Sequence, residues 1–173
     1  PYSPRKQQAF IHTELDKKRF SVLCCHRRFG KTVMLINHLI KCCMTNKNHA
    51  PRFAYIAPTY SQAKKIAWDY LKFYTKGIPH TKYNETELRC DFFNGSRITL
   101  LSSENPDSIR GIYLDGVVCD DDSAIRATAT IPVSLVSGCA CMEPSFTFPD
   151  STLNLFSHIP KGFNAGFICI PLD

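Results

Sequence analysis

Residues 20–44 read FSVLCCHRRFGKTVMLINHLIKCCM. Residues 20–25 are mostly apolar and partly β-branched, which favours a short strand buried on both faces. Gly30 interrupts this pattern, and from residue 31 onward apolar residues recur at the spacing of a helix. The stretch therefore predicts a strand, a glycine turn and a helix, in that order.

A second strand and helix follow along the chain. Residues 52–58, RFAYIAP, predict another buried strand, which Pro58 ends. Residues 61–74, SQAKKIAWDYLKFY, predict an amphipathic helix. Two successive strand–helix units are typical of an α/β fold. The inward face of the second helix is expected to carry Ala63, Ile66, Ala67, Tyr70 and Leu71.

The opening segment of the chain predicts a short helix. Residues 4–15 read PRKQQAFIHTEL, and Pro4 suits the first turn of a helix, where its missing N–H is not needed. Phe10, Ile11 and Leu15 are spaced to share one face. We expect this face to point toward the rest of the domain.

A hairpin and a further strand complete the predicted fold. Residues 86–101 contain two β-type runs on either side of Asn94-Gly95, a strong signal for a hairpin turn. Residues 116–122, GVVCDDD, predict a short apolar strand that ends in acidic residues. The alternation of elements predicts a mostly parallel sheet flanked by helices, with the β-hairpin as an insertion. Residues 123–154 give no clear pattern.

Composition and charge narrow the class of protein. The chain has 173 residues, of which 44% are hydrophobic, and we expect one domain over residues 1–173. The sequence has no long apolar run, which argues against a signal peptide or a membrane span and favours an intracellular protein. The nine cysteines include no CxxC pair, so they are expected to be buried thiols rather than zinc ligands.

The positive charges are concentrated in the first half of the chain. The net charge is +6, and 17 of the 21 Lys and Arg residues lie at or before Arg89, whereas 12 of the 15 acidic residues lie at or after Glu85. Such a basic half favours contact with a polyanion. The alternative is that these side chains form ordinary solvated faces.

The stretch CHRRFGKT, residues 25–32, has the features of a phosphate-binding loop. Such a loop needs backbone N–H groups at the start of a helix, a lysine for the β- and γ-phosphates and a hydroxyl for Mg²⁺. Gly30, Lys31 and Thr32 supply these features, although Cys25 stands where the motif usually opens with glycine. We therefore predict a P-loop NTPase that binds ATP and Mg²⁺, against the alternative of a basic helix start. Arg28 and Phe29 complete the expected nucleotide contacts.

Acidic residues at the end of the strand GVVCD supply the complementary groups. Asp120 is placed to bind the metal, and Asp121 is placed to activate the attacking water. Arg27 is the candidate for stabilising charge that develops during phosphoryl transfer, while Arg28 could equally face solvent or DNA. The alternative is a solvated acidic turn.

These motifs together resemble the ATPase domain of the large terminase subunit, the DNA-packaging motor of tailed bacteriophages. The resemblance covers residues 1–122 and returns near SHIPKG. It implies that Gln8, in a PRxxQ-like element, contacts adenine. It also implies that Lys31 and Thr32 bind phosphate and magnesium, with Asp120 on the metal. By the same resemblance, Arg27 is a finger-like arginine and Asp121 occupies the position of the catalytic acid.

The resemblance also implies partners and a location. The partners are double-stranded DNA, a portal protein and the small terminase subunit, and the full-length protein is expected to form a homo-oligomeric ring. The location is the cytoplasm of the bacterial host, with a virus or prophage as the source and no role for a membrane. The nuclease domain of this family is expected to be absent, so no DNA cleavage is predicted.

The sequence departs from the family pattern in three places. Asp121 stands where the family has glutamate, and Ile159-Pro160-Lys161-Gly162 replaces a TPKG-like coupling element. Residues 123–155 do not resemble the family, and residues 123–173 are therefore expected to be divergent or incomplete, with gene decay or a frame disturbance as a hypothesis. One alternative function is a catalytically impaired or remnant fragment that binds nucleotide. Another is a different P-loop ATPase such as a helicase.

Overall fold

The computed structural model describes residues 2–18, 20–26, 28–104, 109, 112–120 and 163–169, with only the backbone for residues 20, 22, 24, 26 and 163–169. The helical elements are α1 (Lys6–Leu15), α2 (Lys31–Thr45), α3 (Tyr60–Gln62), the π-helical turn η1 (Ala63–Ala67) and α4 (Trp68–Thr75). The strands are β1 (Phe20–His26), β2 (Arg52–Ala57), β3 (Lys82–Asn84), β4 (Arg89–Asp91), β5 (Arg97–Ser102), β6 (Gly116–Asp120) and β7 (Phe163–Cys169).

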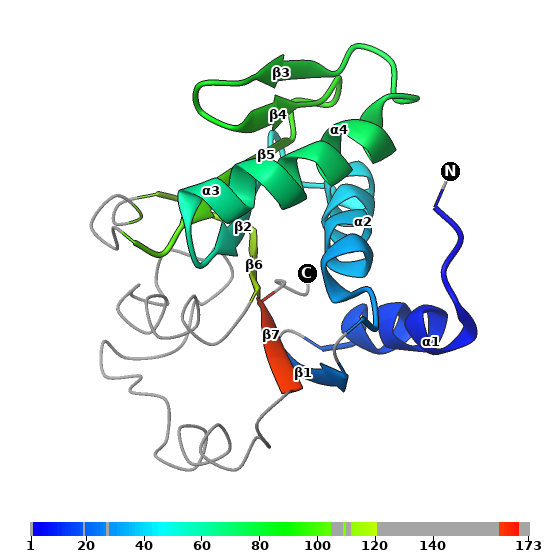
Figure 1. Cartoon of the computed structure of the whole chain (residues 1–173). Helices are drawn as coiled ribbons and strands as arrows, with labels where there is room; N and C mark the ends of the chain where they lie inside the picture. The colour runs from blue at the N-terminus through cyan, green and yellow to red at the C-terminus, as the bar shows by residue number, and fades with distance from the viewer. Residues whose placement is uncertain are drawn as a thin grey trace, which may run out of the picture.

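The described strands form one seven-stranded sheet in the order β1-β7-β6-β2-β5-β4-β3 (Figure 1). β2 pairs in parallel with both β5 and β6. The other described pairings, β1 with β7, β6 with β7, β4 with β5 and β3 with β4, are antiparallel. The expectation of a mostly parallel sheet is therefore wrong, because β7 and the hairpin make the sheet mixed, while the α/β class is confirmed.

Four strands nevertheless share one direction. β7 is antiparallel to both β1 and β6, so β1 and β6 run the same way, and β2 and β5 run parallel to β6. The carboxyl ends of β1, β6 and β2 consequently lie at one edge of the sheet. In open α/β sheets this edge is where ligands bind.

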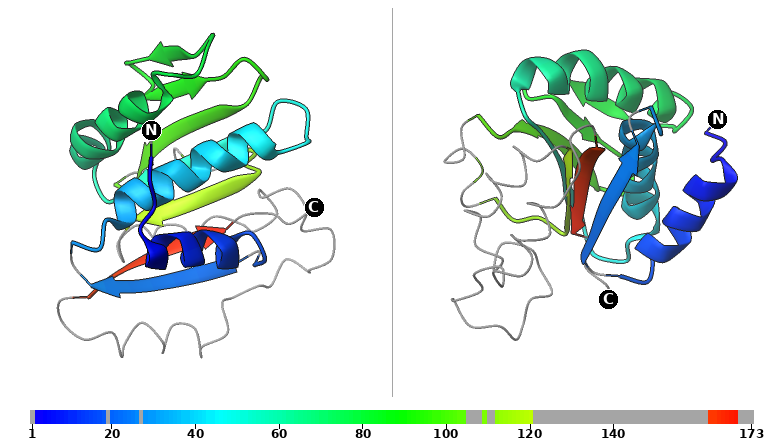
Figure 2. Two further views of the ribbon diagram at one scale, coloured as in Figure 1. Left: turned by 90° about the vertical axis from the view of Figure 1, so that its right-hand side faces the viewer. Right: turned by 60° about the horizontal axis from the view of Figure 1, so that its bottom comes forward.

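The predicted strand, glycine turn and helix are confirmed as β1, the loop at Gly30 and α2. Helices α1 and α2 lie on the same face of the sheet (Figure 2).

The core forms where α2 and α4 pack against the sheet, and burying each large apolar side chain contributes about 1.5–3 kcal/mol. No helix in the described residues is long and apolar enough to cross a membrane. The largest buried side chains include Met34, Leu35, Leu39, Phe53, Tyr55, Trp68 and Leu71.

The hairpin prediction is confirmed. β4 and β5 are antiparallel, with Asp91 opposite Arg97. Gly95 has a left-handed backbone with φ of 80°, and the side-chain oxygen of Asn94 accepts hydrogen bonds from the N–H and the hydroxyl of Ser96, at 3.1 and 2.6 Å. β3 adds a strand beside β4 that the sequence did not predict.

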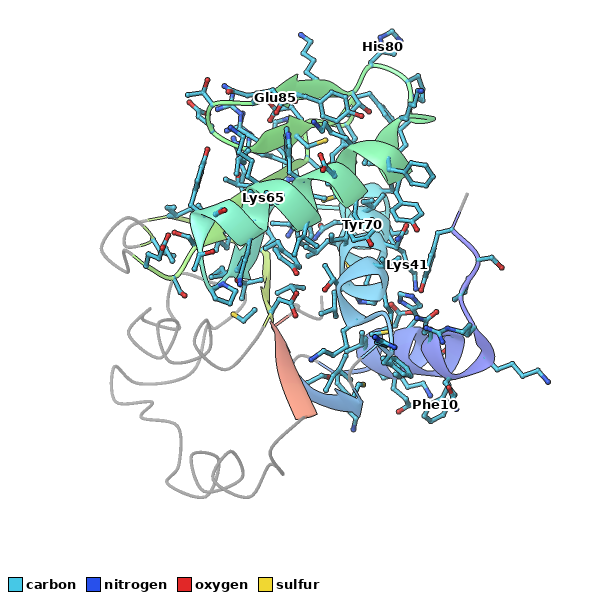
Figure 3. All side chains as sticks on the ribbon, in the orientation of Figure 1. Phe10, Lys41, Lys65, Tyr70, His80 and Glu85 are labelled. Carbon is cyan, nitrogen blue, oxygen red and sulfur yellow. The ribbon has the colours of Figure 1, made fainter. Side chains whose placement is uncertain are left out.

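The predicted inward face of α1 is only partly correct. Leu15 is buried, but Phe10 is 66% exposed and Ile11 is half-buried (Phe10 is labelled in Figure 3). The buried polar residue Gln8 lies on the inner side instead. This helix is therefore held to the domain by polar contacts as well as by apolar packing.

The second predicted helix contains a π-helical turn, η1. Ala63, Ala67 and Leu71 are buried as expected, but Ile66 is 48% exposed and Tyr70 is 39% exposed. A π turn accommodates one more residue than an α turn, so it rotates the positions that follow around the helix axis. The buried residues of this helix consequently recur every four positions, at Ala63, Ala67 and Leu71. Ile66 and Tyr70, which were expected in the core, lie outside the buried face.

Candidate functional site

The glycine loop, residues 27–30, joins β1 to α2, and residues 28–30 of it are described. Gly30 caps α2 in the left-handed region, with φ of 86° and ψ of 33°. A Cβ at this position would lie 3.2 Å from both Arg5 Nη2 and Gln8 Nε2. Glycine is therefore favoured here by backbone conformation and by space. Arg28 is also left-handed, with φ of 69°.

The start of α2 is suited to an anion. An α-helix leaves its first N–H groups without partners inside the helix. The cap of α2 makes no side-chain hydrogen bond, and its first turn carries no acidic residue. The helix dipole adds positive potential at this end, as expected for a phosphate site. Lys31, the first residue of the helix, is buried and 8% exposed.

Thr32 and Asp120 meet beside this helix start. Thr32 follows Lys31 in α2, and Asp120 is the last residue of β6. Thr32 Oγ1 donates a hydrogen bond to Asp120 Oδ2 at 3.0 Å. The hydroxyl of Tyr55, from β2, donates to the same carboxylate oxygen. Hydroxyl groups from α2 and β2 thus converge on one oxygen atom of a residue in β6.

Tyr55 is a permanent donor in this group. It is only 2% exposed. Burial raises the pKa of its phenol well above the usual value, and the neighbouring Asp120 charge raises it further. The phenol therefore keeps its proton at any physiological pH.

A cavity of about 370 Å³ lies between the glycine loop, the ends of β2 and β6, and the η1–α4 helix. This volume is within the range of small-molecule sites. One part of its wall is polar and close to the helix start, and another is apolar and formed by Ile66, Ala67 and Tyr70 (Tyr70 is labelled in Figure 3). The loop and strand residues in the lining include Arg28, Phe29, Gly30, Lys31, Thr32 and Asp120.

Arg5 and Gln8, at the start of α1, contact the glycine loop from outside the cavity lining. Gln8 Nε2 donates to the Phe29 carbonyl oxygen at 3.1 Å, and Arg5 Nη2 donates to the same oxygen. Gln8 Oε1 accepts from the backbone N–H of Arg5 at 3.1 Å, which fixes the amide orientation. The Arg5 guanidinium also lies 5.8 Å from the centre of the Phe29 ring. These contacts brace the loop in the conformation described above.

The structure brings most of the expected site residues together. The loop residues, Thr32 and Asp120 surround one cavity, whereas Gln8 lies outside its lining and contacts the loop instead. Arg27 and Asp121 lie outside the described residues, as does the segment 159–162. The placement of these residues stays a prediction.

The sequence did not reveal Tyr55 or Arg5 as members of this site. Tyr55 stands in RFAYIAP, where an aromatic residue suggests ordinary core packing. The available signal was the tyrosine hydroxyl, because a buried hydroxyl needs a hydrogen-bond partner. The strand GVVCD ends in Asp120, whose carboxylate can accept such a bond. Arg5 belongs to the PRxxQ-like element of residues 4–8, but nothing in the sequence indicated its contact with the Phe29 carbonyl oxygen.

The residues present fit a nucleoside triphosphate with Mg²⁺. The helix start offers N–H groups and a buried lysine, and the hydroxyl of Thr32 lies 3.0 Å from the carboxylate of Asp120. Mg²⁺ prefers oxygen ligands and is usually held by one or two carboxylates together with substrate phosphates. Among the described side chains, no group of three or more His, Cys, Asp or Glu residues gathers to hold a metal without such phosphates.

A family model described as terminase large subunit, T4likevirus-type, N-terminal, matches residues 26–166. The chain belongs to this family. The match covers most of the chain and includes both Thr32 and Asp120, so the two halves of the cavity fall within it. Helix α1, with Arg5 and Gln8, precedes the matched residues. Neither the curated proteins nor the solved structures give a significant match.

Membership in this family gives the domain its general role. The N-terminal region of a terminase large subunit is the ATPase region of the phage DNA-packaging terminase. The terminase domain is thus part of a DNA-packaging protein, and its family implies nucleotide binding. The cavity at the glycine loop is the place in the described structure where that chemistry fits.

Proposed function

We propose that the terminase domain binds ATP with Mg²⁺ at the glycine-loop cavity and hydrolyses it to move double-stranded DNA into a procapsid. The observation that carries this proposal is the 3.0 Å hydrogen bond between Thr32 Oγ1 and Asp120 Oδ2. It joins a hydroxyl at a helix start to a carboxylate at a strand end, although 88 positions separate them in the sequence. This pairing is what a phosphate-bound Mg²⁺ requires.

Each described residue has a role in this proposal. The N–H groups that follow Gly30 hold phosphate oxygens, and the Lys31 ammonium neutralises their charge. Thr32 and Asp120 hold the metal. Mg²⁺, when bound, draws negative charge from the β- and γ-phosphates. Arg28 supplies a further cation at the cavity wall.

Two further roles fall to residues outside the described part of the chain. Asp121 orients and activates the attacking water, supported by its position directly after Asp120. Arg27, in the glycine loop, stabilises the charge that develops on the γ-phosphate. Together with Lys31, these side chains form the proposed catalytic set.

The nucleobase is proposed to be recognised from α1. Gln8 stands in the PRxxQ-like element that contacts adenine by family resemblance. Its amide donates to the Phe29 carbonyl oxygen at 3.1 Å. Gln8 is thus proposed to connect the base with the loop that holds the phosphates.

The DNA is proposed to be held through its phosphates rather than through its bases. A packaging motor has to act on any sequence, and phosphate contacts carry no sequence information. The concentration of 17 of 21 Lys and Arg residues at or before Arg89 supports such contacts. The portal protein, the small terminase subunit and a ring of copies are the further proposed partners of the full-length protein.

A second candidate function is nucleotide binding without turnover. It is favoured by Asp121, because aspartate is one methylene shorter than the glutamate expected at this position by family resemblance. A retracted carboxylate would activate water less effectively. In this case the domain would hold ATP through Lys31 and Thr32 but would not release phosphate.

Phosphate release measured with and without double-stranded DNA distinguishes these candidates. We expect Mg²⁺-dependent release that DNA stimulates, and a loss of about 100-fold in Lys31→Ala, because the variant lacks the cation that faces the transferred charge. Lys47→Ala is the matched control, since Lys47 is an exposed lysine after α2.

The same assay also has outcomes against the proposal. Tight ATP binding without phosphate release would favour the second candidate, and Asp121→Glu should then restore release. A folded protein that binds no nucleotide would contradict both candidates.

A further inference from the structure

We propose that Tyr55 is a positioning residue that fixes the Asp120 carboxylate for the magnesium site. This inference rests on the proposed function. The Tyr55 hydroxyl donates to Asp120 Oδ2, and Thr32 Oγ1 donates to the same oxygen at 3.0 Å. The carboxylate is therefore held by two hydroxyl groups from different elements.

The sheet brings Tyr55 to this position. β2 and β6 are parallel neighbours, and Tyr55 is paired with Val118, two residues before Asp120. The tyrosine is only 2% exposed, so its ring is part of the core. The long phenol side chain extends from the middle of β2 to the carboxylate at the end of β6. Its hydroxyl is anchored by a rigid central strand rather than by a loop.

Packing alone does not explain a tyrosine at this place. Phenylalanine would fill nearly the same volume, and a buried hydroxyl costs free energy unless it has a hydrogen-bond partner. Here the partner is the charged group that the proposed function assigns to the metal. Hydrogen bonds to charged groups are the stronger ones, so the hydroxyl has a large effect on where the carboxylate points.

The two hydroxyl donors have different roles. Thr32 is itself proposed to hold the metal, through a lone pair of the same oxygen whose O–H donates to Asp120, so its position depends on the cation as well as on the carboxylate. Tyr55 comes from β2 and keeps its donation to Asp120 independently of Thr32. The carboxylate thus has one donor that is not itself a proposed metal ligand, and that donor is fixed by a central strand.

The variant Tyr55→Phe tests this inference because it removes one oxygen and keeps the ring. Binding of a non-hydrolysable ATP analogue is measured by calorimetry over a range of Mg²⁺ concentrations and again in EDTA. We expect the Mg²⁺ concentration for half-maximal binding to rise about tenfold, as expected for one hydrogen bond to a charged group. Binding in EDTA should change by less than about twofold, since the phosphate contacts at α2 are untouched.

Tyr83→Phe is the matched control. Tyr83 shares a hydrogen bond with Thr75 Oγ1 at 2.8 Å, in a contact between β3 and α4. This variant should keep the wild-type Mg²⁺ dependence. A double-mutant cycle adds Asp120→Asn, in which Tyr55→Phe should have no further effect on the Mg²⁺ dependence, because the carboxylate is already gone.

Each result decides the inference. An unchanged Mg²⁺ dependence in a folded Tyr55→Phe protein would overturn it, and so would an equal loss of affinity with and without Mg²⁺. A variant that fails to fold by circular dichroism would assign the hydroxyl to the stability of the sheet and overturn it as well. If the wild-type protein binds no nucleotide, the proposed function itself fails, which is a distinguishable result.

Discussion

At the residue scale, His12 of α1 and His38 of α2 form an unusual contact. Their Nδ1 atoms are 2.9 Å apart and their rings are stacked, with centroids 5.2 Å apart. A hydrogen bond between two ring nitrogens needs one N–H and one bare nitrogen, so at least one imidazole must be neutral. His38 Nε2 is buried without a partner among the described residues. A proton on Nδ1 of His38 avoids burying an unpaired N–H.

This pair predicts a loss of stability in mild acid. Burial, followed by the neighbouring His12, lowers the pKa of His38 from 6.5 to about 4. Between these pH values the folded protein binds fewer protons than the unfolded chain, so stability is present above about pH 6.5 and falls as the pH drops toward 4. The contribution is on the order of 3 kcal/mol. Urea unfolding between pH 7 and 4 measures it.

The histidine substitutions separate this effect from general acid unfolding. His38→Leu should flatten the pH dependence of the unfolding free energy, because the buried titrating group is gone. His49→Gln, at an exposed position, should keep the wild-type slope. Equal slopes in both variants would mean that other groups, such as His12, whose pKa burial also lowers, or carboxylates elsewhere, cause the pH dependence.

Gly30 carries a second prediction at this scale. Gly30→Ala places a Cβ in a left-handed conformation and within 3.2 Å of the Arg5 and Gln8 side chains. We expect a loss of stability of about 1–2 kcal/mol and weaker nucleotide binding, because the brace from α1 has to shift. Gly77→Ala is the control, since its Cβ would meet no atom within 4 Å. Equal thermal midpoints in the two variants would contradict the claim that the loop requires glycine at position 30.

At the element scale, the sequence predicted which segments form helices and strands better than which way they face. The apolar pattern of residues 61–74 identified a helix, but it assumed uniform α-helical turns. The π-helical turn η1 changes the rotation, and Ile66 and Tyr70 consequently line the cavity at partly exposed positions. The choice between an α and a π turn depends on packing with α2 and the sheet, which a local pattern does not contain.

The contact between α1 and the glycine loop allows a test of two roles of Gln8. If Gln8 mainly braces the loop through the Phe29 carbonyl, Gln8→Ala should weaken binding of ATP and GTP by the same factor. If it also contacts adenine, ATP binding should fall by a further factor of about 10, as expected for a lost hydrogen bond. We expect the second result, measured by calorimetry with both nucleotides.

Gln7→Ala is the matched control for this prediction. Gln7 is the exposed neighbour of the buried Gln8 on α1, so its loss should change neither affinity. An equal loss for ATP and GTP in Gln8→Ala would remove the proposed adenine contact and leave the brace.

At the scale of the whole molecule, the sequence indicated the helix start and the strand end that form the candidate site. It did not indicate the direction of the strands in the sheet that joins them. Two parts of the site could be recognised because each stands beside a strong apolar pattern. These are the helix start at Gly30, Lys31 and Thr32 and the strand end at Asp120. The mixed direction of the sheet could not be predicted, because it depends on β7. This strand pairs with β6 and with β1, and β1 lies more than a hundred positions earlier in the chain. Strand direction is set by such long-range pairing and leaves no local signal.

The place of β7 has a consequence for synthesis of the protein on the ribosome. β7 separates β1 from β6, so these two strands are joined within the sheet only after residues 163–169 have been added (Figure 1). About 40 residues lie between β6 and β7, and translation at roughly 5–20 residues per second takes about 2–8 seconds to add them. During that interval the edges of β1 and β6 that β7 later covers are unpaired, and unpaired strand edges are natural targets for a chaperone.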